Sequence, residues 1–281
     1  MLSLQSLKLV MNKAFTYLLT LFAVTTFLSS CDNYTKIAKK GTIEQKYNMA
    51  IQAYEKQQYS RALPLLEELI TVYRGTANGE KVLYYYAYCN FNTNDYILAA
   101  YHFKNFAKSF PSSPKAEECA YMAAYCYYLT SPAYSLDQTD THAALRELQS
   151  FVNQYPNSPK IAEATDIVTK LRAKLEMKAY EISKQYFFVG NYKSANVAIV
   201  NFMKDFPDSK YIEELYFTLV KSHYLLTINS IESKKAERLK ITIDTYLRFV
   251  DRYPKSPYLK DAEQIYDDTI KLKEKLKIQT T

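Results

Sequence analysis

Three histidines and three pairs of acids are the residues of this chain that could bind a metal ion or transfer protons. His102, His142 and His223 lie on different predicted helices and share no ligand spacing with a cysteine or an acid. The acids occur as adjacent pairs: Glu67/Glu68, Glu117/Glu118 and Glu213/Glu214. Adjacent side chains point apart on a helix, so we expect solvated charges. With no phosphate loop, nucleophile elbow or H-E-x-x-H, the sequence predicts no enzyme, no metal and no cofactor.

Regularly spaced aromatic residues could instead bind an extended peptide. A shift of 37 residues places Ala50 on Ala87 and then Ala124, and positions i, i+4 and i+7 around them share one helical face. The nine side chains of this face, called the ladder below, are Tyr47, Ile51, Tyr54, Tyr84, Tyr88, Phe91, Tyr121, Tyr125 and Tyr128. Tyrosine offers a broad apolar face and a hydroxyl for backbone groups. The ladder is a candidate peptide groove, and the alternative is that its rings only pack helix against helix.

The spacing of the three cysteines after residue 31 predicts buried side chains and no disulfide or metal site. Cys119 and Cys126 are seven residues apart on one predicted helix, about 10 Å along its axis, which is too far for a disulfide. Cys89 and Cys126 occupy equivalent positions of neighbouring repeats. We expect all three to be small buried residues.

A six-residue motif that occurs four times marks the predicted turns, called joints below, between the helices that would carry these residues. It reads FPSSPK from Phe110, YPNSPK from Tyr155, FPDSKY from Phe206 and YPKSPY from Tyr253. Proline ends a helix, and a serine two residues later can cap the next one. The expected N-caps are Ser113, Ser158, Ser209 and Ser256, three of them followed by a proline as first helical residue: Pro114, Pro159 and Pro257.

Upstream of each joint a small residue precedes a bulky one by four positions, with proline eight further on. The sets are Ala99/Phe103/Pro111, Ala144/Leu148/Pro156, Ala195/Ile199/Pro207 and, more weakly, Thr242/Tyr246/Pro254. This pattern resembles the second helix of the tetratricopeptide repeat. The resemblance implies an all-α, right-handed superhelical solenoid of about five helix hairpins, with the ladder on its concave face. Sustained strand alternation is absent, and only four glycines occur.

The N-terminal thirty residues have the features of an export signal. Lys13 precedes a short apolar run from Ala14 to Leu28, which is brief for a membrane span. The following LSSC resembles a bacterial lipoprotein signal, which implies that residues 1–30 are removed and Cys31 is acylated, with residues 31–42 as a tether. Asp32 resembles an inner-membrane retention signal, which leaves the inner membrane as an alternative to the outer one.

The order of lipoprotein signal, repeats and an extended third joint resembles the BamD family of outer-membrane assembly lipoproteins. The extended joint reads LTSPAYSLDQTDTHAALREL. The resemblance implies a lipid-anchored scaffold on the periplasmic face of the outer membrane. It places repeats one to three, residues 43–158, against unfolded outer-membrane β-barrel proteins. Repeats four and five, residues 159–281, would hold a BamA-like insertase.

Two other functions are consistent with an exported repeat protein. One is a periplasmic tetratricopeptide adaptor that serves cell division or a peptidase. The other is a glycan-binding uptake lipoprotein, although such proteins are usually longer and stack sugars on tryptophan, which this chain lacks. Nucleic-acid binding is not expected, because the modest positive charge forms no basic stripe apart from the helical run at Lys271–Lys277.

Overall fold

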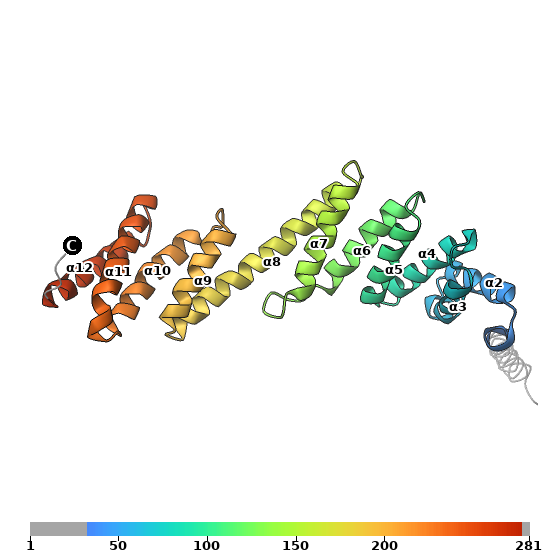
Figure 1. Cartoon of the computed structure of the whole chain (residues 1–281), viewed down its shortest axis with the longest axis horizontal. Helices are drawn as coiled ribbons and strands as arrows, with labels where there is room; N and C mark the ends of the chain where they lie inside the picture. The colour runs from blue at the N-terminus through green and yellow to red at the C-terminus, as the bar shows by residue number, and fades with distance from the viewer. Residues whose placement is uncertain (1–32, 277–281) are drawn as a thin grey trace, which may run out of the picture. The chain divides into compact units, whose positions relative to one another are not determined.

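The computed structural model describes residues 33–276, and no strand occurs among them. The all-α class is therefore confirmed (Figure 1). The helices are α2 (Ile43–Glu55), α3 (Tyr59–Val72), α4 (Ala77–Asn92), α5 (Tyr96–Ser109), α6 (Ala116–Thr130), α7 (Thr139–Gln154), α8 (Ile161–Phe188), α9 (Tyr192–Asp205), α10 (Ile212–Ile228), α11 (Glu232–Arg252) and α12 (Leu259–Lys275). Helices adjacent in sequence pack against each other, within hairpins such as α2 on α3 and between hairpins such as α5 on α6.

The chain folds as two compact units. Unit one holds the described residues up to Ser131 together with Thr139–Ala164, and unit two holds Pro132–Gln138 with the residues from Thr165 onward. The division falls inside α8, which is 28 residues long. The superhelical hand of the solenoid is a property of the whole chain and stays a prediction.

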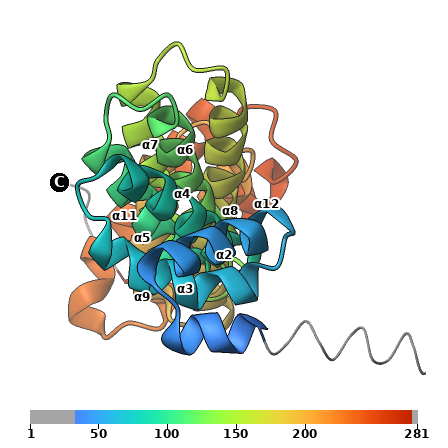
Figure 2. The ribbon, with the colours of Figure 1, turned by 90° about the vertical axis from the view of Figure 1, so that its right-hand side faces the viewer.

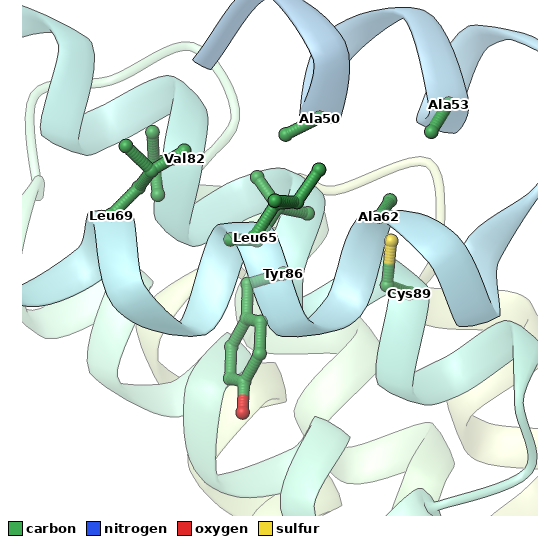
Figure 3. Packing of buried hydrophobic residues seen from close by; sticks show 9 residues of the cluster. Ala50, Ala53, Ala62, Leu65, Leu69, Val82, Tyr86 and Cys89 are labelled. Atoms are coloured by element: carbon green, nitrogen blue, oxygen red, sulfur yellow. The ribbon is translucent and has the colours of Figure 1, made fainter. Parts of the chain in front are cut away.

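Unit one is held together by alternating small and large residues. In its first core cluster, Ala50 on α2 and Ala62 on α3 are fully buried and leave room for the larger side chains of α3, of which Leu69 lies beside Val82 on α4 (Figure 3). A small residue lets two helix axes approach, and a large one fills the groove that the approach leaves. The small-then-bulky pattern of the sequence is thus the pattern of the core.

Residues 33–40, which precede the first hairpin, are also helical. The Tyr34 hydroxyl donates to the Arg61 carbonyl at 2.8 Å, and Tyr34 and Ala38 pack against the first core cluster. Figure 2 shows this segment in blue beside α3. The part of the expected tether that the structure describes is therefore fixed to the first hairpin.

The four joints lie where the sequence predicts them, but the helices begin later. Each serine N–H donates to the carbonyl of the aromatic residue three positions earlier, as in Ser113 to Phe110. The first helical N–H then donates to the serine carbonyl, as in Ala116 to Ser113. Two successive turns therefore precede each helix, and the prediction that the serines are N-caps followed by helical prolines is wrong. The serine hydroxyls still accept from the N–H two residues later, at 3.1–3.2 Å.

Unit two repeats part of unit one with an offset of 96 residues. Helix α5 begins at Tyr96 and α9 at Tyr192, and both have 14 residues. The turn before each contains a left-handed residue, Asn94 with φ 64° and Gly190 with φ 77°. This conformation favours glycine and tolerates asparagine. The offset allows residues of α4 and of the second half of α8 to be compared position by position.

A histidine is enclosed in the packing of unit two. His223 on α10 lies with its Nδ1 atom 3.0 Å from Asn196 Nδ2 on α9. Burial lowers the pKa of His223 from 6.5 to about 4. The unfolded chain therefore binds a proton at a higher pH than the folded chain, so the free energy of unfolding decreases as pH falls from about 6.5 to about 4.

We expect His223→Gln, which keeps a hydrogen-bonding group at this position, to weaken that acid dependence. The measurement is thermal unfolding of the full chain in detergent at about pH 7 and about pH 4.5. The exposed His142 supplies the control, and His142→Gln should retain the wild-type difference between the two melting temperatures. An unchanged difference in His223→Gln would contradict the assignment.

Candidate functional site: the ladder

The ladder residues lie on α2, α4 and α6, the first helices of the three hairpins of unit one. Seven of the nine are partly accessible to solvent. The other two are buried, with Ile51 8% exposed and Tyr121 3% exposed. Ile51 and Tyr121 can therefore contact a peptide only if their neighbours move.

Ring contacts join part of the ladder into a continuous surface. Tyr84 and Tyr88 lie 4.8 Å apart on α4, measured between ring centroids, and Phe91 lies 6.3 Å from Tyr125 on α6. Tyr125 also contacts Tyr121 and Tyr128 on its own helix. The structure thus brings the α4 and α6 members of the ladder together.

The α2 members contact other partners. Tyr47 pairs edge-on with Tyr73 at the end of α3, with 5.6 Å between the ring centroids. Tyr54 stacks on Tyr85 at 4.0 Å, so α2 reaches α4 through a tyrosine that is not in the ladder. The sequence pattern does not place Tyr85 in the ladder, because Tyr85 lies one position away from the helical face that the 37-residue shift defines.

A glutamate of the next hairpin holds the hydroxyls at the centre of the ladder. Glu118 on α6 accepts from Tyr84 at 3.1 Å and also from Tyr88. Burial, together with Glu118, raises the pKa of both tyrosines. The Lys115 ammonium lies 3.7 Å from the centroid of the Tyr84 ring, a cation–π contact. The arrangement ties α4 to α6 and engages the hydroxyls, so a ligand would contact the accessible parts of the rings.

The same contact occurs in unit two. Tyr180 on α8 donates to Glu214 on α10 at 2.8 Å, and Lys184 donates to the Tyr180 hydroxyl at 2.8 Å. Lys184 also forms an ion pair with Glu214 at 3.2 Å. Tyr180 and Glu214 lie 96 residues after Tyr84 and Glu118, so the tyrosine–glutamate contact is a feature of the repeat.

The expectation that the paired acids are simply solvated is therefore wrong for one member of each pair. Glu118 and Glu214 bind tyrosines of the preceding first helix, and Glu68 forms an ion pair with Lys46 at 2.7 Å. Glu118 and Glu214 lie in the first turn of a helix that follows a joint, whereas Glu68 lies within α3, which packs against α2. The sequence did contain a signal for two of them: Glu118 and Glu214 each lie five residues after a joint serine, Ser113 and Ser209.

The cysteines are buried and free, as the sequence predicts. Burial raises the pKa of Cys89 and of Cys126 to about 12, so neither is a reactive thiolate at neutral pH. Residues 33–276 contain no cluster of three histidines, cysteines or acids that could hold a metal ion. None of the helices in this range has both the length and the apolar character needed to cross a bilayer. Cys31, the expected lipid attachment site, lies outside the described residues.

The fold and the ladder define the chain as an array of repeated helix hairpins whose first helices carry aromatic residues. A family model described as "YfiO: Outer membrane lipoprotein" matches residues 39–239 and 186–277, and the chain belongs to this family. The curated relatives described next are named BamD, so the match confirms the resemblance to the BamD family.

Three of these relatives are named outer membrane protein assembly factor BamD. The *Haemophilus influenzae* protein is 21% identical over 86% of this chain and 96% of its own length. The *Pasteurella multocida* protein is 23% identical, over 80% of this chain and 88% of its own. The *Neisseria gonorrhoeae* protein is 24% identical, over 84% and 91%. Among solved structures, a TPR repeats protein from *Bacteroides fragilis* aligns with a TM-score of 0.35 and 15% identity, covering 82% of this chain and 99% of that one.

Proposed function

We propose that the protein is a non-enzymatic, lipid-anchored scaffold of the outer-membrane β-barrel assembly machinery. It binds unfolded barrel proteins and a BamA-like insertase. The observation that carries the proposal is the match of the outer-membrane lipoprotein family over nearly all described residues, with relatives named as outer membrane assembly factors. The helical repeat supports it, because stacked hairpins present extended surfaces suited to binding other chains.

The ladder is the proposed client-binding surface, within residues 43–158. An unfolded barrel strand presents aromatic side chains and unpaired backbone groups. The partly exposed rings of Tyr84, Tyr88, Phe91 and Tyr125 form adjoining apolar faces that could stack with such side chains. Because Glu118 already accepts from Tyr84 and Tyr88, the rings contribute most of the client affinity. Residues 159–281 are proposed to hold the insertase.

The proposal is tested by purifying the tagged full-length protein from detergent-solubilised envelope. We expect a BamA-like insertase to co-purify in near-stoichiometric amount. Recovery of a cell-division complex or a peptidase without the insertase would instead favour the adaptor function. Recovery of glycan-uptake components would favour a glycan-binding uptake lipoprotein.

Anchoring is proposed to depend on Cys31. Cys31→Ser removes the thiol that would take the lipid, so the variant should lose metabolic labelling with palmitate and leave the membrane fraction after any cleavage. Labelling and fractionation of the wild type in parallel provide the reference. Palmitate still incorporated into the Cys31→Ser protein would exclude this cysteine as the attachment site.

Binding by the ladder is separated from packing by two double variants of Tyr84 and Tyr88. Replacement of both by phenylalanine removes the hydroxyls that Glu118 holds and keeps the rings, so barrel-derived peptides should bind with nearly wild-type affinity. Replacement of both by alanine removes the rings and should weaken peptide binding on the order of tenfold or more. Affinity is measured by fluorescence anisotropy.

The melting temperature distinguishes the two interpretations of the ladder. If the rings only pack helix against helix, the alanine variant loses stability, since truncating a buried aromatic residue costs about 3–5 kcal/mol. Unchanged peptide affinity in an alanine variant that remains folded would refute the groove.

A further inference from the structure

The helical segment at residues 33–40 has two opposite faces. Tyr34 and Ala38, one helical turn apart, pack against the first core cluster beside α3 (Figure 2). The exposed lysines Lys36, Lys39 and Lys40 have the spacing i, i+3 and i+4, so they share the other face. The segment is therefore fixed to the first hairpin by its apolar side and presents a row of cations on the opposite side.

These three lysines have no acid to neutralise them. No carboxylate among residues 33–276 forms an ion pair with any of them, and the chain has no acid between Asp32 and Glu44. Arg61 adds a positive charge nearby, with its guanidinium carbon 5.4 Å from the centroid of the Tyr34 ring. Like charges one turn apart on a helix repel each other in water. An anionic surface against this face would offset that repulsion.

Helix α12, the last described helix, shows that a terminal helix of this chain does not need charges of a single sign. It carries four lysines and five acids over 17 residues, and Lys271 lies 3.5 Å from Asp268. Mixed charges of this kind are sufficient to keep a surface soluble. Solubility alone therefore does not account for three lysines without an acid at residues 33–40.

The position of the segment indicates which anionic surface it would meet. Asn33 lies two residues after Cys31, the proposed site of lipid attachment. A segment so close to an acylated residue stays near the lipid headgroups, where charges act over about 8 Å at physiological ionic strength. Anchoring also makes contact with the headgroups intramolecular, so that the weak attraction of a few lysines is sufficient.

We propose that Lys36, Lys39 and Lys40 bind the phosphates of anionic phospholipids in the membrane that holds the lipid on Cys31. The inference rests on the proposed anchoring and adds an electrostatic contact to it. Lysine suits this ligand, because its ammonium group is a compact charge with three donors and needs no fixed phosphate geometry. A protein ligand is disfavoured, since this lysine face lacks the apolar and aromatic anchor residues that protein interfaces bury.

The test uses the full-length lipidated protein on two kinds of vesicle. One consists of phosphatidylcholine alone, and the other also contains about one third phosphatidylglycerol, which is anionic. Flotation with the phosphatidylcholine vesicles first establishes that the protein is anchored. Brief labelling with a water-soluble amine reagent, followed by mass spectrometry, then gives the rate at which each lysine is modified.

We expect Lys40 to be modified at least about fivefold more slowly on the anionic vesicles, because one lysine near an anionic surface contributes roughly this factor. Sodium chloride at about 0.5 M should abolish the difference, since salt screens the attraction. Lys108, an exposed lysine on α5, is the internal reference and should react at the same rate on both kinds of vesicle.

Two double variants change the neighbours of Lys40 and keep Lys40 as the reporter. Lys36→Gln combined with Lys39→Gln removes two charges, and the protection of Lys40 should fall below about twofold. Lys36→Arg combined with Lys39→Arg keeps the charges and should retain the protection. The matched control is Lys193→Gln combined with Lys204→Gln, which removes two exposed lysines of α9 and should behave as the wild type.

Three results would overturn the proposal. One is equal reactivity of Lys40 on both kinds of vesicle in the wild type, and another is full protection in the glutamine variant. The third is faster modification of that variant by the same factor on both kinds of vesicle. The lysines would then only stabilise the segment, as cations near a helix C-terminus do. A wild-type protein that fails to float would instead refute the anchoring, and this inference with it, so the two failures are distinguishable.

Discussion

The stability of this chain depends on contacts between consecutive helices, because no single hairpin can bury both faces of its first helix. Fully buried alanines allow close approach, as Ala62 and Ala99 do, and large neighbours such as Leu66 and Phe103 fill the space that results. Such interfaces act between nearest neighbours, so the stability of the array is approximately a sum of local terms. The tyrosine–glutamate contacts add a polar link between successive first helices at the same level of the repeat.

Much of the fold could be predicted from the sequence because its signals are local. Proline follows the end of a helix at each of the four joints, although Pro64 lies inside α3. The small-then-bulky pattern marks the packed face of each second helix. The start of each helix was predicted less well: a serine before proline is consistent with a cap, yet Ser113 and its equivalents lie in a double turn. The choice between these two conformations depends on backbone hydrogen bonds that residue types alone do not specify.

The site was harder to predict, since it depends on contacts between residues about 34 positions apart. Periodicity placed Tyr84, Tyr88 and Tyr125 on one face, but it could not show that Glu118 would hold two of the hydroxyls. It also could not show that Tyr121 would be buried while Tyr125 stays partly accessible. Side-chain burial depends on the exact approach of the next hairpin, which a repeat length describes only on average.

If Cys31 carries a lipid, as proposed above, the short helix at residues 33–40 limits how far the protein can extend from the membrane. Tyr34 fixes this helix to α3. An extended chain covers at most about 3.6 Å per residue, so a lipidated Cys31 could lie at most about 7 Å from Asn33. Anchored in this way, the first hairpin would rest against the headgroups. The anchor would then set the orientation of the first repeat relative to the bilayer as well as its distance.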